Sequence, residues 1–401
     1  MTAVAAPPAA TTPQLIKQGM YASVACALLL LIAISSGARA HRKAVQTIGR
    51  DTAPSIIAAQ HVAAAMADMD AAAVSEILSQ NQAEAARQSF DNRRKEASEV
   101  LIAAAENITY GDAERVPIRT LATGLSSYAA QIQRAIDLRH VKDPAFLDAY
   151  RAAALEMDGT LLPAATELDH ANRSVFDQTW ADQQKWSSAS MLFLVLAILA
   201  LIGVLISLQV FLTRRTRRMI NPLLMISTGL AFLSFFIFAD AFTTADRQLR
   251  IAKQDAFESV HALWKARAVA YSAKAAESRR LMDAAHAAQD EQAFQQKVTQ
   301  VNGYLADELK NVTFPGELEA ANKAVAAFAA YARTRQPAAF DPFDQAIGET
   351  LQINQSAFDA AVKSSFDALN NVELTASIIC GTIALLALLG LVPRLREYSA
   401  A

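Results

Sequence analysis

The sequence predicts an all-α membrane protein, with four transmembrane helices and two tandem-repeat extracytoplasmic four-helix bundles. Three observations predict this class. Four long stretches contain no charged residue. The polar segments between them are rich in alanine and poor in proline and glycine, which favours helix. Short motifs from the first half of the chain also return in the second half.

The charge-free stretches are long enough to cross a membrane. A helix needs roughly 20 apolar residues to span about 30 Å of hydrocarbon. Each stretch reaches that length and is dominated by Leu, Ile, Val, Ala and Phe. We therefore predict transmembrane helices at 19–38, 187–213, 219–239 and 374–393.

The first apolar stretch has an alternative interpretation. Lys17, the apolar run and Ala38-Arg39-Ala40 resemble a secretory signal with a cleavage site of small residues. We favour a retained helix, because the corresponding stretch in the second half lies inside the chain.

The recurring motifs predict an internal repeat. Asn107-Ile108-Thr109 returns as Asn311-Val312-Thr313, and a segment beginning at Asp51 returns at Asp255, both 204 positions later. A third pair, beginning at Asn172 and Asn354, lies 182 positions apart. The change of offset predicts that the first half holds extra residues near 138–160.

Each repeat should form one bundle, the first over 39–186 and the second over 240–373. Breaks at Asn107, Asp143-Pro144, Asn311 and Gln336-Pro337 divide the bundles into helices. We expect Gly159 and Pro163 to kink the fourth helix of the first bundle. The predicted helices are 39–80, 84–106, 112–138 and 144–186, then 240–287, 290–310, 316–335 and 338–373.

Charge predicts the orientation in the cell membrane. The short segments outside the bundles are an N-terminal arm (1–18, expected to be disordered), a loop (214–218) and a tail (394–401). Short basic segments stay in the cytoplasm, so we predict both termini inside and both bundles outside. The basic residues are Lys17, Arg214, Arg215, Arg217, Arg218, Arg394 and Arg396.

The same basic loop is the candidate site for docking a cytoplasmic protein. Arg214, Arg215, Arg217 and Arg218 lie within a few residues of one another. The alternative is that they only set topology and touch anionic lipid. We expect membrane lipids, but no nucleic acid, among the partners.

The motifs of common catalytic sites are missing from the sequence. It contains no glycine-rich phosphate loop, no nucleophile elbow, no Cys-x-x-Cys and no His-x-x-x-His pair. We therefore expect no enzyme activity, cofactor or metal. Cys26 and Cys380 lie in predicted spans at different depths, so no disulfide is expected. The spans carry no Asp, Glu, Lys, Arg or His, which disfavours a coupled transporter.

The pattern resembles two kinds of sensor. A helical bundle that continues into membrane helices is similar to the sensor domains of bacterial chemoreceptors. The chain also resembles the GlnX family of actinobacterial membrane proteins across most of its length. The segments that carry this second resemblance are Ala67-Asp68-Met69-Asp70 and Ile48-Gly49-Arg50-Asp51-Thr52-Ala53-Pro54-Ser55-Ile56-Ile57-Ala58-Ala59-Gln60.

The GlnX resemblance implies a relay. An outer solute-binding lipoprotein (GlnH) senses acidic amino acids, and the signal reaches a cytoplasmic Ser/Thr kinase (PknG). We therefore expect a non-enzymatic transmembrane relay between such partners. Two alternatives stay open: a direct receptor with a small molecule between the bundle helices, and a structural membrane scaffold.

Overall fold

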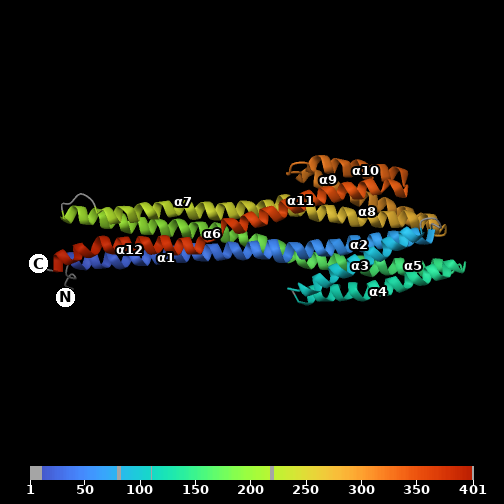
Figure 1. The fold of residues 1–401 in the computed structure, drawn as a ribbon, viewed down its shortest axis with the longest axis horizontal. Helices are drawn as coiled ribbons and strands as arrows, with labels where there is room; N and C mark the ends of the chain where they lie inside the picture. The colour runs from blue at the N-terminus through green and yellow to red at the C-terminus, as the bar shows by residue number, and fades with distance from the viewer. Residues whose placement is uncertain (1–10, 79–82, 110, 217–220, 400–401) are drawn as a thin grey trace, which may run out of the picture. The chain divides into compact units, whose positions relative to one another are not determined.

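The computed structural model describes residues 11–78, 83–109, 111–216 and 221–399, and these residues form an all-α structure without strands. Figure 1 shows the helices in chain order. The first half comprises α1 (Thr12–Gln46), α2 (Ala53–Leu78), α3 (Ala83–Glu106), α4 (Asp112–His140), α5 (Phe146–Glu156) and α6 (Leu162–Thr216). The second half comprises α7 (Pro222–Arg250), α8 (Glu258–Met282), α9 (Ala287–Asn311), α10 (Glu317–Thr334), α11 (Asp341–Ala368) and α12 (Val372–Ser399).

Three π-helical segments join neighbouring α-helices without a turn. They are η1 (Thr47–Thr52), η2 (Met157–Leu161) and η3 (Ile251–Phe257). The segment η2 lies where Gly159 and Pro163 predicted a kink. The starts of η1 and η3 are 204 positions apart. Single π-turns inside helices occur frequently at functional sites.

The N-terminal arm is shorter than predicted. The helix α1 begins at Thr12, so the prediction of disorder over 1–18 is wrong from that residue onward. Two interactions explain the early start. The Gln14 side chain accepts a hydrogen bond from the Thr11 backbone N–H at 2.9 Å, and Ile16 is completely buried. Residues 1–10 lie outside the described part.

One compact unit, here called the apolar unit, contains the described residues of 1–45, 180–248 and 363–401. Its helices expose large apolar side chains, including Leu29, Ile32, Phe193 and Phe232. Four helical stretches are long and apolar enough to cross a membrane, as expected of a multi-pass membrane protein. They are Thr12–Leu78, Phe146–Arg215, Pro222–Met282 and Pro337–Arg396.

A polar node around Asp246 of α7 ties together three helices of the apolar unit. Gln183 of α6 donates to Asp246 at 3.1 Å, and Ser187 of α6 also donates to it. His41 of α1 lies 3.3 Å from the same carboxylate and stacks on Phe242, with ring centroids 4.9 Å apart. A network of several hydrogen bonds fixes helix register more firmly than isolated pairs do.

The second compact unit, the polar unit, contains the described residues of 46–179 and 249–362. It holds two hydrophobic cores. The first bundle (α2, α3, α4 and α5 through residue 179) buries Met66, Phe90, Tyr128 and Tyr150, among others. The second bundle (α8, α9, α10 and α11 through residue 362) buries Leu263, Phe294, Phe328, Phe343 and Leu351, among others.

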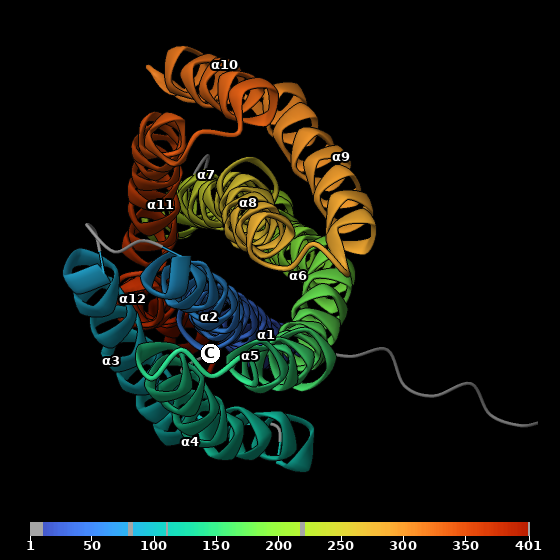
Figure 2. The same cartoon turned by 90° about the vertical axis from the view of Figure 1, so that its right-hand side faces the viewer.

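The first helices of the two bundles, α2 and α8, pack against each other. In Figure 2, α2 and α8 lie side by side, with α3 and α4 on one side and α9 and α10 on the other. Ala64 and Ala67 of α2 belong to the core of the second bundle. The small alanine side chains let the helix backbones approach closely. The polar unit is therefore one packed body rather than two separate bundles.

Candidate functional site

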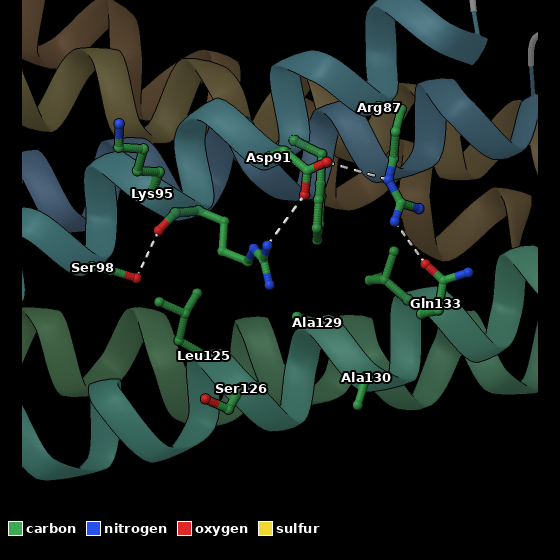
Figure 3. A pocket seen from close by; sticks show the side chains of 12 residues that line it. Arg87, Asp91, Lys95, Ser98, Leu125, Ser126, Ala129, Ala130 and Gln133 are labelled. Atoms are coloured by element: carbon green, nitrogen blue, oxygen red, sulfur yellow. Dashed lines mark hydrogen bonds and ion pairs between the residues drawn. The ribbon is translucent and has the colours of Figure 1, made fainter.

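A groove lies between α3 and α4 on the first bundle (Figure 3). Its volume is about 660 Å³, within the range of small-molecule and peptide sites. Phe90, Leu125 and Ile132 line it and are buried. The other lining residues are Arg87, Asp91, Arg94, Lys95 and Ser98 on α3, and Ser126, Ala129, Ala130 and Gln133 on α4.

The α3 wall of the groove is basic. Arg87 donates across the groove to Gln133 at 2.8 Å and lies 3.5 Å from both Glu76 and Asp91. Arg94 also lies 3.5 Å from Asp91. Exposed ion pairs of this length contribute little to stability. Arg94 and Lys95 are thus only loosely engaged by the protein itself, whereas Arg87 is held by Gln133 and Glu76.

The corresponding surface of the second bundle is closed. Phe294 stands 204 positions after Phe90, and Glu291 stands 204 positions after Arg87. The Arg335 guanidinium covers the Phe294 ring, 4.6 Å from its centroid, and binds Glu291 at 2.6 Å. Arg335 also lies 3.3 Å from Glu277. One side chain therefore occupies in the second bundle the place that is open in the first.

A buried ionic network joins the two bundles. Asp70 of α2 accepts hydrogen bonds from Tyr128 at 2.8 Å, Tyr150 at 3.1 Å and Arg279 of α8 at 3.1 Å. Burial raises the pKa of the Asp70 carboxyl, and the Arg279 charge opposes that rise. Arg279 also contacts Asp158 at 3.2 Å. Removing Arg279 would leave the desolvated Asp70 carboxylate without its cation, whereas Arg279 has a further partner in Asp290 at 3.7 Å.

A second polar cluster lies around Asp68. Arg93 of α3 donates to Asp68 at 2.5 Å, and its charge opposes the rise that burial causes in the Asp68 pKa. Arg93 also donates to Glu96 at 2.5 Å. His61 contacts the same Glu96 and stacks on Trp264 of α8, with centroids 4.7 Å apart. This cluster also connects α2 and α3 to α8.

A pair of buried carboxyls belongs to the second bundle. Glu308 and Glu317 are hydrogen-bonded to each other, and both are almost fully buried. Glu317 already accepts the backbone N–H groups of Thr313 and Phe314 at 2.7 and 2.8 Å. Burial, together with the charge of Glu317, raises the pKa of Glu308 to about 7.

The candidate docking arginines lie only partly in the described structure. Arg214 and Arg215 are exposed in the last turn of α6. Arg217 and Arg218 fall outside the described residues. Within the described residues, no group of His, Cys, Asp and Glu side chains has the arrangement of a metal site.

The residues that connect the bundles were not predicted as a site from the sequence. Asp68 and Asp70 are two positions apart, so they face different sides of α2, and neither was singled out as a site. The structure buries both and gives each a different arginine. The available signal was two acidic residues inside an otherwise apolar run from Ala63 to Val74, because isolated charges in such runs need partners.

Comparison with known proteins identifies one part of the chain. Residues 44–181 match the family model described as an actinobacterial sensor domain. None of the curated proteins and none of the solved structures compared with the chain matches it. The matched region contains the whole first bundle, including the groove. The match supports a sensor-type protein of actinobacteria with a role in signal sensing.

Proposed function

We propose that the chain is a non-enzymatic transmembrane relay. Its outer bundles dock a solute-binding lipoprotein that carries an acidic amino acid, and the signal passes to a cytoplasmic Ser/Thr kinase. In this arrangement both termini and the basic loop are cytoplasmic. The GlnX resemblance supplies the identity of the two partners, GlnH and PknG.

The observation that carries the proposal is the match of 44–181 to a sensor domain, on a chain with four helices suited to a membrane. The helix α6 begins inside the matched region at Leu162 and runs to Thr216. An uninterrupted helix transmits small shifts or rotations along its axis. Such a helix can carry a change in the first bundle to the exposed Arg214 and Arg215.

The buried ionic network supports a coupled response of both bundles. Asp70 of α2 lies inside the matched region, whereas Arg279 of α8 lies outside it. Because a buried ion pair resists separation, α2 and α8 move together. A shift caused by docking on one bundle would therefore also move the first helix of the other bundle.

The proposal is tested with the full chain in phosphatidylcholine nanodiscs. We expect the lipoprotein loaded with glutamate or aspartate to bind at least tenfold more tightly than the empty lipoprotein. Free glutamate or aspartate should give no binding heat in calorimetry. Tight binding of the free amino acid to the chain would overturn the relay.

The cytoplasmic side is tested separately. Replacing Arg214, Arg215, Arg217 and Arg218 by Gln should abolish the kinase response while the orientation of the chain stays unchanged. An unchanged response with unchanged orientation would remove the loop from the proposed docking site.

A direct small-molecule receptor is the second candidate. The volume and the basic wall of the α3–α4 groove favour it, since both suit an anionic ligand. The calorimetric experiment above distinguishes the two functions.

A further inference from the structure

We propose that the α3–α4 groove is the docking site for an acidic amphipathic helix of the extracytoplasmic protein partner. The inference rests on the proposed relay, because it names the surface on which the relay's partner binds. It is carried by the shape of the groove, the spacing of its charges and the closed surface at the corresponding place in the second bundle.

The shape suits a helix. Arg87, Asp91, Arg94, Lys95 and Ser98 follow one face of α3, at the spacing of three and four that keeps residues on one side. They extend over 87–98, which at 1.5 Å per residue is about 17 Å, or roughly three turns. The opposite wall contains Ser126, Ala129 and Ala130, whose small side chains allow a third helix backbone to approach closely.

The charges define the chemistry of the occupant. The lining residues include three cations, Arg87, Arg94 and Lys95, and one anion, Asp91. Arg94 and Lys95 keep 50 and 77 % of their side-chain surface exposed. Within the described part of the chain, Lys95 forms one ion pair, with Glu99 at 3.7 Å. Partner carboxylates can therefore replace these weak internal pairs at little cost.

The length of the charged wall favours a protein segment over a free amino acid. A single amino acid reaches one or two of these cations, whereas charges spread from Arg87 to Lys95, over about 12 Å, match carboxylates repeated on successive turns of a helix. Helices bind to grooves in this way, with one face buried and polar groups at the rim.

The second bundle provides an internal comparison. The positions 204 after Arg87, Arg94 and Lys95 are Glu291, Val298 and Thr299, so the basic wall is missing there. Arg335 covers Phe294 and pairs with Glu291. The open, basic groove therefore belongs to the bundle that matches the sensor family.

The test measures binding to the full chain in phosphatidylcholine nanodiscs. The probe is a labelled synthetic helix with Glu at positions 1, 5, 8 and 12 and Leu or Ala on the other face. We expect R87E/R94E/K95E to weaken its binding at least tenfold. The matched control R115E/R119E/R134E makes the same change of net charge on exposed residues of α4 that do not line the groove, and should change binding less than twofold.

Three outcomes would overturn the inference. In the first, the groove and control variants weaken binding equally. In the second, the same peptide with Gln in place of Glu binds as tightly as the original. In the third, the groove variant would lose binding of free glutamate but not of the peptide. If charge reversal disturbs folding, R87Q/R94Q/K95Q replaces it, with an expected loss of at least fivefold.

The lipoprotein serves as the second probe and separates the two proposals. If it binds the wild-type chain and the groove variant equally, the groove assignment falls and the relay stands. If it fails to bind the wild-type chain, the relay falls, and the acidic peptide still decides whether the groove receives a helix.

Discussion

The two bundles of the polar unit use the same loop for different chemistry. Thr109 donates its backbone N–H to Glu114 at 2.8 Å, and Thr313 does the same to Glu317 at 2.7 Å. In the second bundle Glu308 lies against this acceptor. Ala104 stands 204 positions earlier in the first bundle, so the Glu114 loop has no corresponding acid there.

The outer surfaces of the two bundles also differ. The first bundle keeps an open α3–α4 groove with a basic wall. In the second bundle Arg335 covers the corresponding Phe294, and the groove lies instead between α10 and α11. The same packing scheme thus leaves an open basic groove in the first bundle and places a carboxyl of raised pKa, Glu308, in the second. Such differences are expected where packing needs only the apolar positions, because exposed and loop positions are free to change.

The largest predicted effect comes from separating the bundles. R279M leaves the Asp70 carboxylate buried without its cation, and we expect a loss of about 3–5 kcal/mol. Thermal unfolding of the full chain in nanodiscs measures it. R115M is the control and should cost less than about 1 kcal/mol, since Arg115 pairs with Asp112 at the surface.

A double variant sharpens the same point. D70N/R279M removes both charges and should recover at least half of the loss, because no buried charge is left without a partner: Asp290 keeps Arg151 at 3.1 Å, and Asp158 is exposed. Equal destabilisation by R279M and R115M would mean that the ionic network does not hold α2 against α8.

The second prediction concerns pH and belongs to the second bundle alone. Glu308 holds a proton in the folded chain up to its raised pKa of about 7, whereas its ordinary pKa is 4.5. The stabilisation is fully present below about pH 4.5 and is lost as pH rises through 7, by roughly 3 kcal/mol at most. E308Q keeps a hydrogen-bond donor without titrating and should remove this loss.

Unfolding midpoints recorded between pH 5 and 8 check the pH prediction. The exposed Glu319 on the same helix as Glu317 provides the control, and E319Q should keep the wild-type dependence. A wild-type dependence that persists in E308Q would assign the effect to another group.

The smallest predicted difference comes from two asparagines at matching positions. Asn107 donates to Ser55 Oγ at 3.0 Å. Asn311 donates to the Gln254 and Asp255 carbonyls and to Ser259 Oγ, at 2.9–3.0 Å. We expect N107A to cost about 0.5–1 kcal/mol and N311A about 1–2 kcal/mol, because more acceptors lose their donor.

Hydrogen exchange of the loops and unfolding midpoints together measure the asparagine pair. N302A, an exposed position on α9, controls for loss of an asparagine in general. An equal cost for N107A and N311A would show that the additional acceptors of Asn311 are satisfied equally well by water.

Much of the fold could be predicted from residue patterns. The helix bounds agree with prediction within a few residues at most ends, for example 84–106 for α3 (Ala83–Glu106) and 316–335 for α10 (Glu317–Thr334). Local rules suffice here, because turn residues such as Asn107 and Pro144 act through their own backbone geometry. The long apolar runs likewise indicate membrane helices by length alone.

The sites could be predicted far less well. The only predicted docking residues were the four arginines from Arg214 to Arg218, and the described structure shows two of them, exposed at the end of α6. The groove needs α3 and α4 to lie apart, and the Glu308 pair needs two helices to meet. A local sequence pattern specifies neither the separation of α3 from α4 nor the approach of the two helices that carry Glu308 and Glu317.

The amino-acid sequence by itself determined the helices, their order and the apolar stretches, because each depends on neighbouring residues and on periodicity. Only the tertiary structure decided that α2 packs on α8, that Asp70 meets Arg279 across 209 positions, and that Arg335 covers Phe294 while Phe90 lines an open groove. These contacts depend on which faces of distant helices come together. A side chain's charge and size restrict that choice, but the packing of the whole unit makes it.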